Sequence, residues 1–336
     1  MSQHNIYPRF SMVLGVPPQL KAWWIYLEDY GQRVVRGALG HLPSLMDIQP
    51  CRDIIEATTA FWDEKRVVFR FSNNEMTPLL EEISGYVENA ALLHKKKKWQ
   101  NCGMIIPKEP LPKEFVNSFR FRKGKGVECL QGSAIPFDYL YHRFGYQQSF
   151  TNHQDEFFSY DSWKQKRCFA FAVCFLGTMV FAKGTTRDIH TRLITVTEAL
   201  FGGIEGKYYT SVPMIVADIY RALGRCKHGY KHFEGCNLLL QIWLIEHLQK
   251  VDRSLAFRKP TGENHILGHV PGAILTNRSF EKPNYVEGWV RLLSHLNDDS
   301  IQWMFGWFPS EGLVFRTKIV PFLVLMGLRG LQPYAH

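Results

Sequence analysis

The chain has 336 residues, of which 46% are hydrophobic and 21% are charged. This composition excludes wholesale disorder and is sufficient for a sizeable core. A net charge of +9 favours acidic partners, either nucleic acid or an acidic protein face, although an ordinary basic protein has the same balance. The seven scattered cysteines exclude the disulfide framework of a small secreted domain and favour a reducing compartment.

Amphipathic segments dominate the first part of the chain. Apolar residues recur at helical spacing over 20–34 and again over 50–62, which predicts two helices. Alternating apolar residues over 66–72 predict one short strand. Thr77-Pro78 is typical of the cap and first turn of another helix. We find no secretory signal at the N-terminus.

Lysines, glycines and prolines dominate residues 94–135, and we expect a long basic loop or linker there. Basic runs serve as nuclear import signals or phosphate contacts, and aromatic residues among them, here Phe119 and Phe121, stack on bases. A solvated surface loop is the alternative. The candidate nucleic-acid or import-signal residues are Lys95, Lys96, Lys97, Lys98, Arg120, Arg122, Lys123 and Lys125.

The next part of the chain holds a long apolar run at 168–182, which is too short to span a bilayer. We interpret it as part of a buried helix, capped by Ser162. Asp188 is expected to cap the helix that follows.

Residues 213–248 are the most distinctive stretch, and they predict two helices joined by a short basic hinge. Pro213 suits the first turn of the first helix, and Asp218, Arg221 and Arg225 are spaced to pair along one face. The second helix is apolar nearly all round from Leu238 onward, which is typical of a buried core helix.

These elements predict a mainly α-helical bundle with a few short strands and the long basic insertion. We expect an irregular N-terminus at 1–17, a helical lobe at 18–93, the basic linker at 94–135 and a main helical core at 136–336. Alternatively, the first lobe and the core form one continuous domain.

The sequence lacks the motifs that are typical of an enzyme. The stretch Gly202–Lys207 is one residue too short for a phosphate loop, and Tyr208 stands where a Mg²⁺-binding hydroxyl is needed. We expect the carboxylates of Asp218, Glu234 and Glu246 to form ion pairs on helix surfaces. The sequence therefore predicts no catalytic residue and no cofactor.

One weak metal candidate lies in the basic hinge. Its residue types suit zinc, but its spacing is not that of a standard zinc framework. The alternative is a buried Cys236 with exposed hinge histidines. The four candidate ligands are Cys226, His228, His232 and Cys236.

Several phrases of the sequence resemble the plant mobile domain, in its branch of uncharacterised plant proteins. The structural motif residues that we single out are Trp62, Asp218, Arg221, Cys236 and Trp243. The phrases are Trp23-Trp24, His41–Leu45, Ile55–Ala57, Phe61–Asp63, Val68–Phe71, Glu75–Ile83, Ala217–Leu223, Phe233–Trp243 and Gly327–Tyr334.

The resemblance implies a mostly helical domain that spread with plant transposable elements and occurs in nuclear proteins linked to gene silencing and genome stability. The family label "aminotransferase-like" carries no catalytic evidence, and no lysine here is placed by motif to hold pyridoxal phosphate. Members of that family usually continue past the Gln-Pro-Tyr phrase, so we expect a truncated gene product or an isolated domain.

We therefore expect a non-enzymatic nuclear module that binds a protein or chromatin, with the cytoplasm as the alternative location and no membrane association. The first alternative function is nucleic-acid binding through loop 94–125. The second is a degenerate transposase accessory or an unrecognised metal-dependent enzyme.

Overall fold

The residues form two compact units, and neither unit is one continuous stretch of sequence. The first unit contains 47–91 and 212–336 together with the N-terminal 14 residues, and the second contains 15–46 and 92–211. The candidate residues Lys95–Lys98 lie outside the described residues. The computed structural model describes residues 7–11, 15–88, 102–123, 125–184, 186–202, 208–248, 283–303 and 323–334.

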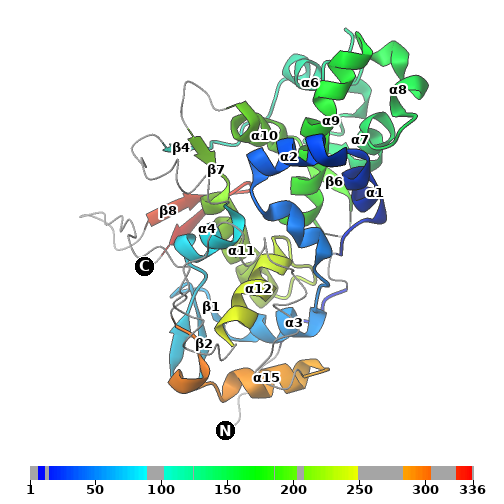
Figure 1. Ribbon diagram of the computed structural model, residues 1–336. Coiled ribbons are helices and arrows are strands. Elements are labelled where there is room, and N and C mark those ends of the chain that lie inside the picture. Colours follow the sequence, from blue (N-terminus) through cyan, green and yellow to red (C-terminus); the bar gives the residue numbers. More distant parts are fainter. Residues whose placement is uncertain are drawn as a thin grey trace. The chain divides into compact units, whose positions relative to one another are not determined.

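The structure is mainly α-helical, with a few short strands, which confirms that part of the expected fold (Figure 1). Within the described parts of the chain, no helix combines the length and the apolar character that crossing a membrane requires.

The second unit is arranged around α9 (Tyr160–Phe175), whose C-terminal half is buried. The cap of α9 is Ser159, whose side chain accepts a hydrogen bond from the Ser162 backbone, so the helix begins earlier than the sequence predicts. A π-helical turn over Leu176–Val180 follows it. The contacts of α9 include α1 (Pro18–Tyr26), α2 (Glu28–Leu39), α6 (Pro112–Phe119), α7 (Phe137–Phe144) and α10 (Arg192–Gly202).

Three expectations for this unit are wrong in detail. The single helix over 20–34 is two helices, α1 and α2, because Glu28 takes a positive φ of 55° between them. Asp188 does not cap a helix, since it begins strand β6 (Asp188–His190), which pairs with β5 (Ala134–Pro136).

The third correction concerns the long basic loop, which the structure does not show in the described part of 94–135. Helix α6 occupies its centre, because Pro112 suits a first turn and the Glu114 carboxylate accepts a hydrogen bond from the Leu111 backbone at 2.7 Å. Phe115 and Phe119 are its buried face. The other elements are β4 (Cys102–Met104), which pairs in parallel with β7 (Tyr208–Thr210), a 3₁₀ turn at Val127–Cys129 and strand β5. Helix α8 (Ser149–Asn152) lies further along.

The first unit has α12 (Asn237–His247) in its core, and every residue of this helix is buried, as the apolar sequence predicts. Figure 1 shows α3 (Arg52–Ala60) and α4 (Leu80–Val87) beside it, and both contact it. Helix α15 (Val286–Ser294) packs on α3.

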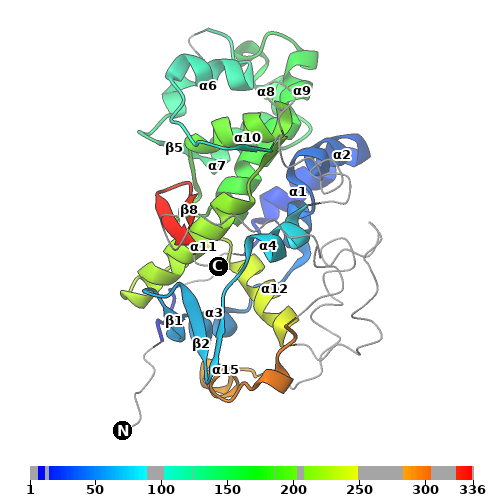
Figure 2. The ribbon, with the colours of Figure 1, turned by 90° about the vertical axis from the view of Figure 1, so that its left-hand side faces the viewer.

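Two small sheets complete the first unit. Strands β1 (Trp62–Asp63), β2 (Val68–Phe71) and β3 (Asn74–Met76) form an antiparallel meander. Strands β8 (Leu323–Met326) and β9 (Leu331–Tyr334) form a hairpin. Figure 2 shows the hairpin along α11 (Val212–Lys227), and both of its strands contact that helix.

Candidate functional site

Helix α11 positions the candidate site in the first unit. Its apolar residues recur at helical spacing and are buried, and its last turn carries basic residues that suit the negative end of the helix dipole. The helix ends where Gly229 adopts a positive φ of 88°, a conformation that glycine reaches without steric cost. The polar residues of α11 therefore project from a rigid element.

A buried ion-pair network lies along one side of α11. Oδ1 of Asp218 is 3.5 Å from Nε of Arg221, and its Oδ2 is 3.5 Å from Nη1 of Arg329. Glu234 accepts hydrogen bonds from Arg225 and, at 3.4 Å, from Nη2 of Arg221. The predicted pairing of Asp218 with Arg221 is present, whereas Arg225 pairs with Glu234 instead.

The expectation that these carboxylates lie on helix surfaces is wrong. Asp218, Glu234 and Glu246 are all buried. Burial raises the pKa of Asp218, although Arg329 and Arg221 act in the opposite direction. Burial also raises the pKa of Glu246 to about 7. Local spacing cannot reveal this, because the groups that cover them come from distant parts of the chain.

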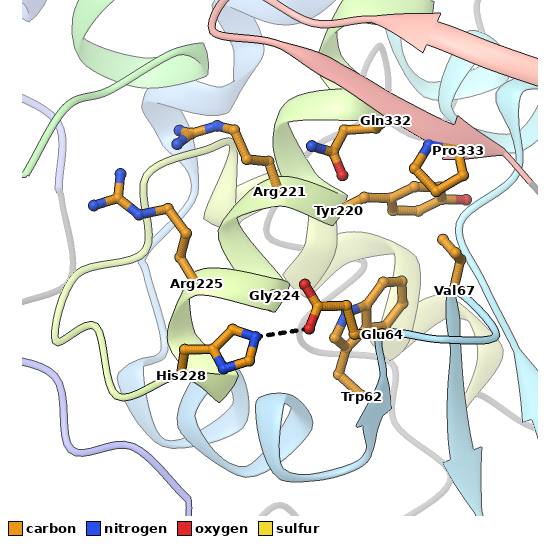
Figure 3. Close-up of a pocket in the computed structure, with 10 residues that line it drawn as sticks. All are labelled: Trp62, Glu64, Val67, Tyr220, Arg221, Gly224, Arg225, His228, Gln332 and Pro333. Carbon is orange, nitrogen blue, oxygen red and sulfur yellow. Dashed lines mark hydrogen bonds and ion pairs between the residues drawn. The ribbon is translucent and has the colours of Figure 1, made fainter.

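A hollow of about 240 Å³ opens beside this network, and we call it the α11 hollow (Figure 3). Parts of α11, of the β1–β2 turn and of β9 form its walls, and Trp62 and Tyr220 are its aromatic sides, with ring centroids 5.4 Å apart. The residues that line it are Trp62, Glu64, Val67, Tyr220, Arg221, Gly224, Arg225, His228, Gln332 and Pro333.

Trp62 brings a buried hydrogen-bond donor to the wall of this hollow. The residue is only 3% exposed, and its indole Nε1 has no hydrogen-bond partner among the described residues. By contrast, Nε1 of Trp243 donates to Glu82 at 2.7 Å. A buried donor without an acceptor costs about 1–3 kcal/mol, so such groups call for an explanation.

Glu64 lies in the same hollow. Its Oε2 is 2.8 Å from Nε2 of His228, and both side chains are largely exposed, at 54% and 73%. Figure 3 shows the Glu64 carboxylate in front of Gly224, and a Cβ at that glycine would lie 2.8 Å from Oε1 of Glu64. The absence of a side chain at Gly224 therefore makes room for Glu64.

A second polar cluster lies between α4 and α12. Oε2 of Glu82 accepts hydrogen bonds from Trp243 and from the Leu79 backbone, and Oε1 lies 3.1 Å from Nε2 of His247. Nδ1 of His247 donates to the Gln302 carbonyl at 2.7 Å. All of these contacts tie structural elements together, so we interpret this cluster as a core network.

The weak zinc candidate does not assemble. Sγ of Cys226 donates to the His232 carbonyl, Cys236 is buried, and His228 is exposed and pairs with Glu64. Burial raises the pKa of both cysteine thiols to about 12, which disfavours the thiolate that binds zinc. Among the described residues, no group of three or more His, Cys, Asp and Glu side chains is placed to hold a metal.

The aromatic residues that lie between the basic residues of the second unit are not placed for base stacking. Phe119 and Phe121 are buried in an aromatic cluster, so they are not available to stack on bases. Nη1 of Arg120 donates to Gln165, and Lys125 pairs with Asp155 at 3.1 Å. Arg122 and Lys123 are exposed.

The predicted structural residues all fall in the first unit, and two of them, Trp62 and Arg221, line the α11 hollow. Sequence reasoning missed Glu64, Gln332 and Pro333 as residues of a site. The only signal for the last two was their place in the phrase Gly327–Tyr334.

Comparisons with known proteins identify a family without a described activity. No curated protein and no solved structure matches the chain significantly. A family model for a domain of unknown function, DUF7745, matches residues 20–335. Since this match covers nearly the whole chain, the protein belongs to the DUF7745 family.

Proposed function

We propose that this chain is a non-enzymatic protein-interaction module and that the α11 hollow receives a side chain of its partner. The observation that carries the proposal is the indole Nε1 of Trp62, a buried donor in the wall of the hollow with no acceptor among the described residues. A partner group that supplies the acceptor would recover the free energy that this donor costs.

The size of the hollow supports a side chain rather than a cofactor. Small-molecule and cofactor sites usually have volumes of about 300–1,000 Å³. The α11 hollow, at about 240 Å³, is below that range. Deeply buried anchors of this kind contribute much of the affinity in protein interfaces.

The resemblance to the plant mobile domain supports a wider setting for this module. We propose a transposon-derived plant nuclear protein that binds a protein or chromatin partner and acts in gene silencing or genome stability. Nucleic-acid binding through 94–125 stays an alternative proposal, and the burial of Phe119 and Phe121 removes its stacking component.

Site-specific photo-crosslinking in plant nuclear extract tests the proposal. A photoreactive phenylalanine replaces Pro333 at the rim of the hollow, and a control protein carries it at Glu75, an exposed residue of the same unit outside the hollow. We expect a discrete protein adduct from position 333 only. Adding Trp62→Phe, which keeps a ring but removes the donor, should weaken that adduct.

Equal adducts from both positions, or an adduct that is insensitive to Trp62→Phe, would contradict a role for the hollow. An adduct from position 333 that disappears after nuclease treatment would favour the nucleic-acid alternative instead.

A further inference from the structure

We propose that the partner group received by the α11 hollow is the carboxylate of an acidic side chain, and that Glu64 fills part of the hollow in the unbound protein without reaching Nε1 of Trp62. This inference rests on the proposed function and specifies its ligand. Three observations on the first unit carry it.

The first observation is the position of Glu64 itself. Its carboxylate lies within the hollow, over Gly224, and contacts Nε2 of His228 at 2.8 Å (Figure 3). A Cβ on residue 224 would come within 2.8 Å of Oε1. The hollow therefore already accommodates a carboxylate, and the missing side chain of residue 224 gives that carboxylate its space.

The second observation is the hydrogen-bonding character of the other lining groups. The indole Nε1 of Trp62 can only donate. The guanidinium groups of Arg221 and Arg225 also only donate, but both already donate to Glu234. They extend away from Trp62 and Glu64 (Figure 3). Among the described residues that line the hollow, Glu64 alone carries a carboxylate. A ligand that accepts hydrogen bonds fits the Trp62 donor, whereas a cationic ligand would leave Trp62 without an acceptor.

The third observation is the balance of charge. Three guanidinium groups lie in and beside the hollow, and two of the carboxylates that pair with them, Asp218 and Glu234, are buried and fixed by those pairs. Glu64, which lines the hollow and pairs with His228, adds a third carboxylate to this group. If Glu64 leaves, the hollow loses one negative charge, which an incoming carboxylate restores.

Glu64 is the lining carboxylate that can be exchanged. It lies in the turn between β1 and β2, its side chain is 54% exposed, and its ion pair among the described residues is with the exposed His228. Exposed pairs of this kind are weak. Because Nε1 of Trp62 is closed to solvent, an incoming acceptor reaches it only after a lining side chain moves, and Glu64 is an exposed side chain that can do so.

Titration of the ¹⁵N-labelled full chain with small probes tests this exchange. The indole N–H cross-peak of Trp62, assigned by its loss in Trp62→Phe, reports on the hollow. The probes are N-acetylglutamate amide, its neutral match N-acetylglutamine amide, the cationic N-acetyllysine amide and inorganic phosphate. We expect N-acetylglutamate amide to move this cross-peak and the glutamine and lysine probes to leave it in place.

The variant Glu64→Ala should bind N-acetylglutamate amide more tightly, by up to about fivefold, which is the range that an exposed ion pair can contribute. The matched control is Glu75→Ala, which removes an exposed carboxylate that pairs with Arg66 and Arg70 outside the hollow. This control should change the affinity little, because it alters the net charge equally but leaves the hollow as it is.

Binding of the lysine probe, or an affinity for the glutamate probe that Glu64→Ala leaves unchanged or lowers, would overturn the inference. Phosphate that moves the cross-peak at lower concentration than the glutamate probe would overturn the carboxylate assignment. A crosslinked partner that requires Trp62 but is not displaced by N-acetylglutamate amide would refute the inference alone and leave the proposed function intact. A probe response without any crosslinked partner would refute the proposed function alone.

Discussion

The indole Nε1 of Trp243 donates a hydrogen bond to Oε2 of Glu82 across 2.7 Å, and so joins α12 to α4 over 161 residues of sequence. The second oxygen of the same carboxylate lies 3.1 Å from His247. A carboxylate buried without such partners would be strongly destabilising. These contacts therefore explain how an acidic side chain is accommodated beside α12, every residue of which is buried.

Replacing Trp243 by phenylalanine should lower the free energy of unfolding by about 1.5–3 kcal/mol from the lost hydrogen bond to a charged group, in addition to the smaller loss of packing. Trp62→Phe is the matched control, since its indole donor has no acceptor among the described residues. Urea denaturation of both variants measures the difference. Equal losses of stability would show that the bond to Glu82 contributes nothing beyond packing.

Asp218→Asn should destabilise the first unit by about 3–5 kcal/mol, because it leaves the guanidinium groups of Arg221 and Arg329 without their carboxylate. Burial raises the pKa of Asp218, so the attraction of its arginine partners does not fully offset the cost of desolvating the carboxylate. Removing the carboxylate alone nevertheless lowers the stability further than keeping both partners. Glu75→Gln, which weakens exposed pairs with Arg66 and Arg70, should cost about 0–1 kcal/mol. Chemical denaturation distinguishes the two, and similar values would contradict the buried network.

Glu246→Gln should become progressively more stable than the wild type as the pH rises from 5 to 7. Burial raises the pKa of Glu246 to about 7 in the folded chain, above its ordinary value of 4.5. Between these values the folded state binds more protons than the unfolded state, so wild-type stability falls with rising pH. The total difference amounts to about 3 kcal/mol, and it levels off above pH 7.

The measurement is the free energy of unfolding of both proteins at several pH values. The titrations of other groups are common to both proteins and cancel in the difference between the two free energies. A difference that stays constant between pH 5 and pH 8 would show that Glu246 titrates normally.

Phe121→Ala should cost about 3–5 kcal/mol of stability, because the ring is buried against Phe119 and Phe157. Lys123→Ala, at an exposed neighbour, should cost less than about 0.5 kcal/mol. Thermal unfolding checks both variants. If Phe121→Ala instead keeps full stability and weakens binding to single-stranded nucleic acid, the ring is a stacking residue after all.

Helical periodicity in the sequence located the elements on which the site depends. The apolar spacing in 213–223 and the apolar run from Leu238 predict α11 and α12, because the repeat of 3.6 residues is a local property. Composition predicted the structure of 94–135 less well, because its basic residues and glycines indicated a loop where α6 has a buried face. Capping was ambiguous by a few residues, as Ser159 and Ser162 show, since both can serve as a cap.

Side-chain spacing within single segments was enough to predict that the chain is mainly helical and that the helix from Leu238 onward is buried. The folded chain, by contrast, brings Trp62, Gly224 and Gln332 to one hollow that Glu64 enters, and it buries Asp218 and Glu234. Burial depends on segments that lie far apart in the sequence, as Asp218 and Arg329 do, and no periodicity within one helix records which distant segment packs against it.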